Sequence, residues 1–196
     1  SRYSTDEKWL VPHFEKMLYD NALLSLAYLE ACRLTRRPLY GTAARRVLDY
    51  VLRELTGAEG GFFCGQDADS DGVEGKYYVF TPEELRQVLG EPDADAFCRW
   101  FGVTEQGNFE GKSIPNLIGN PRFEEPDARL DALCGRLYKY RLSRARLHKD
   151  DKVLTSWNAL MIAALAKAGL ILREPAYLQA AEKARRFLAE RLTDGR

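Results

Sequence analysis

The sequence predicts a mainly α-helical protein, part of an α/α toroid of stacked helical hairpins, with a β-hairpin inserted near residues 61–80. Apolar residues recur at helical spacing through most of the 196 residues. One helical hairpin occurs twice, at an offset of 137 residues. Aromatic runs on either side of an Asp- and Ser-rich cluster interrupt the helical pattern and favour strands.

The first predicted hairpin joins a largely buried helix to an amphipathic one. Between residues 17 and 34, apolar side chains follow helical spacing and cover most of the helix surface. A short polar link then leads to Pro38, which suits the first position of a helix. We expect this second helix to end at Gly57, since glycine favours helix ends.

The segment between residues 60 and 80 is expected to form the β-hairpin. Residues 60–63 and 76–80 are aromatic and favour strands, and residues 67–72 between them are rich in Asp, Ser and Gly. The pattern predicts that the two aromatic runs pair and that the acidic cluster connects them.

Further helices are predicted from their start signals. A capping box at Thr81–Glu84 begins a helix that runs to about Leu89, and Asp93 can cap a short one that follows. Residues 102–125 are predicted to form a long ordered loop, of the kind that covers or lines another part of a protein. Another helix is expected over residues 127–147.

The second copy of the hairpin closes the chain. Thr155 or Ser156 is expected to cap a helix that runs through residues 159–172, and Pro175 opens a helix that ends near Leu192. Residues 20–56 align with residues 157–193 without a gap, with twelve identities in 37 positions.

The prediction of a toroid depends on this repeat. Each copy is an apolar helix, a turn into proline and a more amphipathic helix, so neighbouring copies are expected to stack. A closed ring with apolar helices inside fits this pattern, and an open solenoid is the alternative. Asn21 and Asn158 are equivalent in the repeat, which favours a shared structural role such as bonding a neighbouring loop.

The amino-acid composition argues against several classes of function. Lys and Arg balance Asp and Glu at 29 each, so there is no overall field to attract nucleic acid or a membrane surface. The longest apolar run, residues 159–166, is too short to span a bilayer. The four cysteines lie far apart, which predicts reduced thiols, a cytoplasmic protein and no metal site.

The stretch Trp9–Asn21 is the first candidate site, because it combines a histidine, both charge signs, aromatic rings and an amide. If a helix begins near Pro12, then His13, Lys16 and Asp20 lie on one face at spacings of three and four. Such groups lining a cavity orient one another and shift one another's pKa. The alternative is that His13 bonds a backbone carbonyl while its charged neighbours are solvated.

The acidic cluster is the second candidate site. Asp67, Asp69 and Asp71 with Gly72 begin like a calcium loop, but Tyr78 stands where the bidentate glutamate belongs. A plain hairpin turn and carboxylates presented to a cavity stay open as alternatives. Closely set carboxylates raise one another's pKa, which suits acid/base chemistry.

Four motifs together resemble one known family. They are Arg2-Tyr3-Ser4 with Asp6, residues 9–22, residues 67–70 with 73–79, and residues 151–161. The chain resembles the spermatogenesis-associated, thioredoxin-domain-fused family, which includes the YyaL-like proteins of bacteria. In that family a thioredoxin-like domain precedes a six-hairpin toroid similar to N-acylglucosamine 2-epimerases and six-hairpin glycosidases.

The resemblance implies a carbohydrate-sized funnel at one end of the ring and a sugar-like small molecule as ligand. The catalytic candidates are His13, Asp20, Asp69 and Glu74. The expected ligand-binding residues are Arg2, Trp9, Glu15, Lys16, Asp67, Tyr78, Asp151, Lys152 and Trp157. No metal and no cofactor are expected.

Two sugar chemistries and one non-catalytic role stay open. Epimerisation uses two acid/base groups, usually histidines, and the chain has only His13 and His148. Glycoside hydrolysis uses two carboxylates, about 5–5.5 Å apart in retaining and about 6.5–9.5 Å apart in inverting enzymes. The alternative is a non-catalytic module that binds a ligand or partner beside a thioredoxin-like domain.

The family's thioredoxin-like domain is absent from residues 1–196. We therefore expect a single fragment of the toroid domain, without redox activity. By itself this fragment is expected to be inactive and to form a homodimer through exposed toroid edges.

Overall fold

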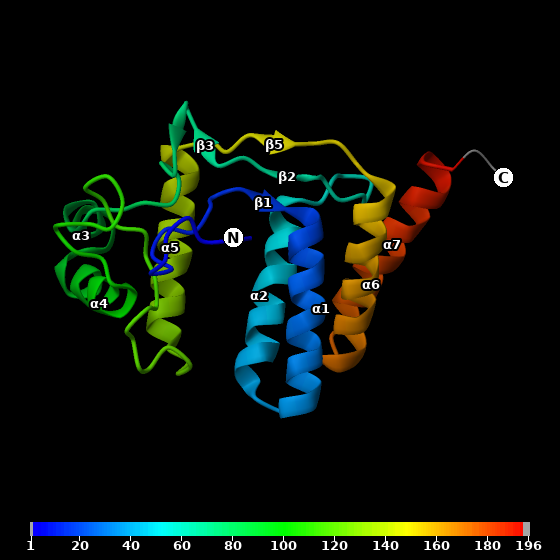
Figure 1. The fold of residues 1–196 in the computed structure, drawn as a ribbon, viewed down its shortest axis with the longest axis horizontal. Coiled ribbons are helices and arrows are strands. Elements are labelled where there is room, and N and C mark those ends of the chain that lie inside the picture. The colour runs from blue at the N-terminus through cyan, green and yellow to red at the C-terminus, as the bar shows by residue number, and fades with distance from the viewer. Residues whose placement is uncertain (1, 194–196) are drawn as a thin grey trace. The chain divides into compact units, whose positions relative to one another are not determined.

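The computed structural model describes residues 2–193, and these residues are mainly helical, which confirms that part of the prediction (Figure 1). The chain divides into two compact units. Unit 1 comprises Ser1–Glu15 and Asp67–His148, and unit 2 comprises Lys16–Gln66 and Lys149–Arg196.

Unit 2 contains both helical hairpins. They are α1 (Leu18–Thr35) with α2 (Pro38–Glu54), and α6 (Thr155–Ile171) with α7 (Pro175–Arg191). Each hairpin packs its two helices together, and α1 also packs against α6. The four helices share one core because each contributes fully buried apolar side chains to it. Figure 1 shows that α1 and α6 begin at the same end of this unit.

The sequence repeat is a repeat of structure. The starts of α1 and α6 are 137 residues apart, and so are the starts of α2 and α7. The turns between the helices also match, since Arg36 and Arg173 adopt the left-handed conformation with φ of 61° and 59°. Two copies of one local sequence pattern therefore fold alike, including a strained residue that glycine would occupy more easily.

The contact between the two helices of a hairpin is conserved through an exchange of sizes. In the first copy, a Cβ on Gly41 would lie 3.3 Å from Sγ of Cys32. In the second copy the equivalent pair is reversed, and a Cβ on Gly169 would lie 2.4 Å from Cγ of Leu178. One small and one larger side chain fill the space in both copies, as close packing requires.

Reversing this exchange should be costly. We expect Gly169→Cys to lower the free energy of unfolding of unit 2 by about 2 kcal/mol, because it overpacks the contact with Leu178. The double variant Gly169→Cys/Leu178→Gly recreates the Cys32–Gly41 pair. In a double-mutant cycle measured by urea denaturation, it should show a favourable coupling of about 1 kcal/mol. Additive effects would contradict the exchange.

A small sheet lies beside these helices in unit 2. It consists of β1 (Lys16–Met17), β2 (Gly65–Gln66) and β5 (Lys149–Asp150), antiparallel and in that order. Helix α1 begins at Leu18, so the condition for a shared helix face, a helix that begins near Pro12, is not met. The backbone of Lys16 pairs with Gln66, a partner distant in sequence that local periodicity does not reveal. His13 and Lys16 consequently do not share a helix face with Asp20.

Unit 1 combines three helices with a short hairpin. The helices are α3 (Pro82–Leu89), α4 (Glu91–Phe101) and α5 (Ala128–Arg144), and they share a separate core. The predicted cap at Thr81 is confirmed, because its Oγ1 accepts a hydrogen bond from the Glu84 amide at 3.2 Å, whereas the Glu84 carboxylate binds Arg144 and Tyr140. Asp127 caps α5 in the same way through the Leu130 amide.

Two predicted caps are wrong. Helix α4 begins at Glu91, so Asp93 lies in its first turn, where its carboxylate binds Arg129 and Arg136 instead. Helix α6 begins at Thr155 itself, with Leu154 at the cap position. The cap was predicted three residues too late in α4 and one or two residues too late in α6, because a polar residue in the first turn resembles a cap.

The β-hairpin lies within the predicted range, but its strands differ. They are β3 (Asp69–Ser70) and β4 (Val73–Glu74), which flank Asp71-Gly72. Both turn residues have positive φ, 54° and 75°, as a two-residue hairpin turn requires. The aromatic runs do not pair with each other, since Phe62 pairs with Thr56 and Phe80 with Ser113. The strong local turn determines the hairpin, and the aromatic residues serve the cores.

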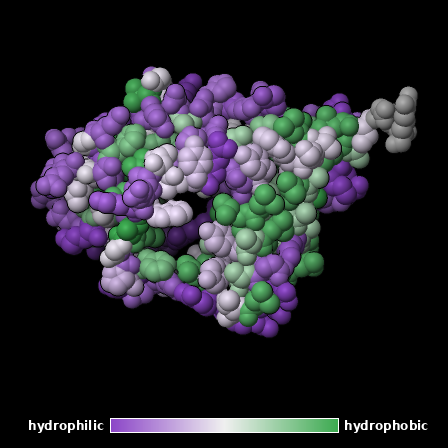
Figure 2. Space-filling model, viewed as in Figure 1, coloured by the Kyte–Doolittle hydropathy of each residue, from purple (hydrophilic) through white to green (hydrophobic). Residues whose placement is uncertain are grey.

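Unit 2 also exposes apolar side chains. Figure 2 shows apolar residues gathered over α1, α6 and α7 on the face in view. Exposed leucines on these helices include Leu23, Leu34 and Leu170, the last of which is 73% exposed.

Candidate functional site

The N-terminal segment of unit 1 brings three predicted residues together. Arg2 Nη2 and Glu15 Oε2 form an ion pair at 2.8 Å. The rings of Tyr3 and His13 stack with centroids 4.7 Å apart, and the His13 amide donates to the Tyr3 carbonyl at 2.9 Å. His13 is thus positioned by stacking and by its backbone, with Glu15 two residues away.

A turn centred on Asp6 holds this arrangement. Its Oδ1 accepts from the Val11 amide at 2.7 Å, and its Oδ2 accepts from the Lys8 amide at 2.9 Å. The bond from Val11 is the main reason that the pKa of Asp6 is lowered, against a smaller opposing effect of burial. Trp9 lies on this turn at φ 61° and is 73% exposed.

The acidic hairpin presents its carboxylates to solvent. Asp67, Asp69 and Glu74 are exposed, and Asp69 is the cross-strand partner of Glu74. Asp71 is paired with Lys76 at 2.7 Å. Among residues 2–193, no group of three His, Cys, Asp or Glu side chains could hold a metal ion. Tyr78 stacks on the buried Phe14 with centroids 5.3 Å apart, which ties the segment after the hairpin to the N-terminal segment.

One predicted catalytic residue lines a cavity. Glu74 borders a space of about 220 Å³ in unit 1, together with Val73, Lys76, Val79, Phe109, Glu110 and Lys112. The cavity therefore combines two carboxylates and two lysines with an aromatic ring and two valines. Its lining thus mixes charged groups with apolar side chains, a combination that small-molecule sites also use.

Glu110, the second carboxylate of this cavity, was not among the residues predicted from the sequence. Glu110 and Gly111 form a tight turn with φ of 47° and 74°, closed by the bridge between Phe109 and Lys112. A glutamate at positive φ is strained by about 1–2 kcal/mol. The Glu-Gly pair between Phe109 and Lys112 is a sequence signal for a tight turn. It lies inside residues 102–125, which were predicted only as a loop.

Arg144 fixes one wall of this cavity. Its guanidinium donates to the carbonyls of Lys76, Tyr77 and Val79 and to the Glu84 carboxylate. The Tyr140 hydroxyl also donates to Glu84, at 2.8 Å. Burial, followed by the bond to Glu84, raises the pKa of Tyr140.

The predicted residues of unit 2 lie at or near the starts of α1 and α6. Asp20 lies in the first turn of α1, where the helix dipole favours a carboxylate. Trp157 occupies the equivalent place in α6, and its ring meets that of Tyr19 edge-on with centroids 4.7 Å apart. Lys16 lies in β1, two residues before α1.

The loop before α6 carries the remaining pair. Asp151 and Lys152 are exposed, and Nζ of Lys152 lies 3.1 Å from Oδ2 of Asp150. The bond with Asp150 raises the pKa of Lys152. Burial, and then the charge of Asp150, raises the pKa of the Cys64 thiol, so this cysteine is an inert packing residue.

The predicted residues thus divide between the two units. In unit 1 they are Arg2, Trp9, His13, Glu15, Asp67, Asp69, Glu74 and Tyr78, and in unit 2 they are Lys16, Asp20, Asp151, Lys152 and Trp157. Within unit 1 the structure brings Arg2, His13 and Glu15 together, and it places Glu74 at a cavity. The single carbohydrate funnel expected from the sequence stays a prediction.

The described residues define a mainly helical protein with a repeated helical hairpin and no helix that is both long and apolar enough to cross a membrane. No known family model matches the chain. Over 98% of its residues, the chain is 34% identical to spermatogenesis-associated protein 20 of Homo sapiens and of Mus musculus. It is also 30% identical to uncharacterized protein B0495.5 of Caenorhabditis elegans, again over 98% of the chain.

These similarities support the family resemblance inferred from the motifs. The chain spans 29% of the length of the human and mouse relatives and 31% of the worm protein. It therefore corresponds to one part of much longer proteins.

Proposed function

We propose that the chain is part of a carbohydrate-active domain and binds a sugar-like molecule in the Glu74 cavity of unit 1. The observation that carries the proposal is the pair of carboxylates, Glu74 and Glu110, at one cavity with two lysines and Phe109. Sugar hydroxyls bond to carboxylates and ammonium groups, while the apolar face of a sugar ring packs on an aromatic side chain. Paired carboxylates are also the groups that glycoside hydrolysis uses.

The fold adds support from unit 2. The two hairpins repeat with the same helix starts, and the apolar helices α1 and α6 pack side by side. Continuation of this pattern would give the proposed α/α toroid, related to six-hairpin glycosidases and N-acylglucosamine 2-epimerases, of which this chain is a fragment. A thioredoxin-like domain elsewhere in the longer protein is part of the same proposal.

A non-catalytic binding module is the second candidate. Glu74 and Glu110 are both exposed, and a solvated carboxylate lacks the low-dielectric surroundings that tune catalytic acids. This observation favours binding without turnover in the chain by itself. Both proposed functions include a cytoplasmic location of the protein.

The test is titration of the ¹⁵N-labelled chain with glucose, N-acetylglucosamine and 4-nitrophenyl β-glucoside, followed by NMR. We expect at least one of them to shift the amides of residues 73–79 and 109–112 in a saturable way. Glu74→Gln and Glu110→Gln should each weaken this binding about tenfold, because each removes a charge-assisted hydrogen bond. Release of 4-nitrophenol that both variants abolish would favour the enzyme over the module.

Glu83→Gln is the matched control, since Glu83 is an exposed acid on α3 outside the cavity. It should bind as the unchanged chain does. The proposal is wrong if none of the sugars binds, or if both cavity variants bind as tightly as Glu83→Gln.

The exposed leucines of unit 2 motivate a related proposal. We propose that Leu23, Leu34 and Leu170 are covered when the isolated chain forms a homodimer through what would be toroid edges. Static light scattering tests this proposal, and a monodisperse monomer would contradict it.

A further inference from the structure

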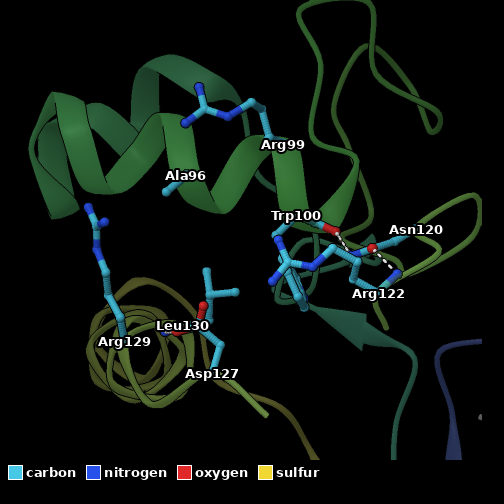
Figure 3. Close-up of a pocket in the computed structure, with 8 residues that line it drawn as sticks. All are labelled: Ala96, Arg99, Trp100, Asn120, Arg122, Asp127, Arg129 and Leu130. Atoms are coloured by element: carbon cyan, nitrogen blue, oxygen red, sulfur yellow. Dashed lines mark hydrogen bonds between the residues drawn. The ribbon is translucent and has the colours of Figure 1, made fainter. Parts of the chain in front are cut away.

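A second cavity in unit 1 lies between α4, α5 and the segment that precedes α5. It has a volume of about 320 Å³ and is lined by Ala96, Arg99, Trp100, Asn120, Arg122, Asp127, Arg129 and Leu130. Figure 3 shows Ala96 and Leu130 pointing into the same space from α4 and α5, with Arg129 on one side and Trp100 with Arg122 on the other. The cavity thus has a small apolar centre between arginines.

The walls of this cavity are held in place by bonds that leave its centre open. The Asn120 side chain donates to the Trp100 carbonyl at 3.1 Å and accepts from the Arg122 amide at 2.9 Å. The Arg122 guanidinium lies over the Trp100 ring, 5.5 Å from its centroid. One asparagine therefore joins the backbones of the two residues whose side chains form this cation–π contact.

The arginines keep unused donors. Arg122 binds Glu125 through Nε and Nη2, and Arg129 binds Asp93 through the same two nitrogens. In each case Nη1 makes no hydrogen bond with any residue that the structure describes. Arg99 makes no hydrogen bond or ion pair with a described residue at all. A guanidinium has five N–H donors. Several N–H groups around this cavity therefore have no hydrogen-bond acceptor among the described residues.

The charges of the lining also favour an anion. Three arginines line the cavity against one carboxylate, that of Asp127. Oδ1 of Asp127 is already occupied, because it accepts the bond from the Leu130 amide that caps α5. Fixed guanidinium forks recognise carboxylate and phosphate groups with defined geometry.

We propose that this cavity binds a small organic anion, a phosphate ester or carboxylate attached to a flat apolar body. The anionic group is held by the free Nη1 group of Arg122, whose guanidinium lies beside Trp100, while Arg99 and Arg129 add positive charge from other sides of the cavity. The apolar body packs between Ala96, Leu130 and Trp100. A cavity of about 320 Å³ falls at the lower end of the range for small-molecule sites, which favours a compact ligand.

Phenyl phosphate is the probe, with inorganic phosphate and phenol as its two halves. The indole N–H signals of the ¹⁵N-labelled chain report on the site, and Trp100→Phe identifies the signal of Trp100. We expect phenyl phosphate to shift that signal in a saturable way and to leave the Trp157 signal in unit 2 unchanged. It should bind at least about tenfold more tightly than either half, since both parts of the site then contribute.

Arg122→Gln should weaken phenyl phosphate binding about tenfold, because a charge-assisted bond is lost. This variant loses the exposed ion pair with Glu125, which contributes little to stability, so its fold should be intact by circular dichroism. Arg185→Gln, on α7 outside the cavity, should bind as the unchanged chain does. The proposal is overturned if Arg122→Gln binds as tightly as Arg185→Gln, if either half binds as tightly as phenyl phosphate, or if Trp100 does not respond.

Discussion

Asn158→Ala is expected to lower the free energy of unfolding of unit 2 by about 4 kcal/mol, because it leaves two buried backbone groups without partners. The Asn158 side chain is 0% exposed. Its Oδ1 accepts from the Phe62 amide at 2.7 Å, and its Nδ2 donates to the Phe62 carbonyl at 2.9 Å. Phe62 is itself fully buried, so water cannot replace either bond.

Asn21 is the matched control, because it occupies the equivalent place in the first copy of the repeat. It shares one bond with Asn158, since Asn21 donates to the Met17 carbonyl at 2.7 Å and Asn158 donates to the Leu154 carbonyl at 3.1 Å. Asn21 is only partly buried. Asn21→Ala should therefore cost about 1 kcal/mol, the value of one ordinary hydrogen bond.

Native-state hydrogen exchange measures both variants unit by unit. In Asn158→Ala, amides of α1 and α6 should lose protection by the amount of the destabilisation, while amides of α3 and α5 serve as an internal reference. Equal losses in Asn158→Ala and Asn21→Ala would contradict the special role of the Phe62 contact.

The two asparagines also show how far a repeat allows prediction. The sequence placed them at equivalent positions and indicated a structural role, such as bonding a neighbouring loop. Both bond the carbonyl four residues earlier, but only Asn158 bonds the loop at Phe62. A repeat therefore predicts the shared local bond, whereas the loop contact depends on a chain segment that has no second copy.

The helices were predictable because their signals are local. Pro38 and Pro175 mark the starts of α2 and α7 within their own turns, and Thr81 caps α3. The sheet of unit 2 was not predictable in this way. Its strands are two residues long and pair Lys16 with Gln66 and Gln66 with Lys149. So short a strand has no periodicity of its own.

The candidate site was predictable only in part for the same reason. Glu74 stood out within a dense acidic motif, and the structure places it at a cavity. Glu110 reaches that cavity through a tight turn in a loop, and no sequence pattern linked it to Glu74. Arg99, Arg122 and Arg129 line their cavity from a helix, a loop and a second helix, a combination that only tertiary structure reveals.

Arg144→Met is expected to lower the free energy of unfolding of unit 1 by about 3 kcal/mol, because it breaks a largely buried ion pair and leaves its partners unbonded. The side chains of Arg144 and Glu84 are only 16% and 19% exposed, and their atoms meet at 2.6 Å. The same guanidinium bonds the carbonyls of Lys76, Tyr77 and Val79. It therefore links α5 to the segment that follows the acidic hairpin.

Arg136 provides the control for Arg144, since it lies on the same helix and also binds a carboxylate and backbone carbonyls. Its side chain is 49% exposed, so water replaces the lost bonds. Arg136→Met should cost at most about 1 kcal/mol. Arg144→Lys should recover only part of the loss, because an ammonium group cannot serve four acceptors with the geometry of a guanidinium.

Urea denaturation and hydrogen exchange of the α3 and α5 amides measure these differences. Because Lys76 and Val79 line the Glu74 cavity, Arg144→Met should also shift the NMR signals of residues 73–79, whereas Arg136→Met should leave them in place. Equal destabilisation by Arg144→Met and Arg136→Met would mean that burial adds nothing to this ion pair. Unchanged signals at residues 73–79 in Arg144→Met would mean that the guanidinium does not hold the cavity wall.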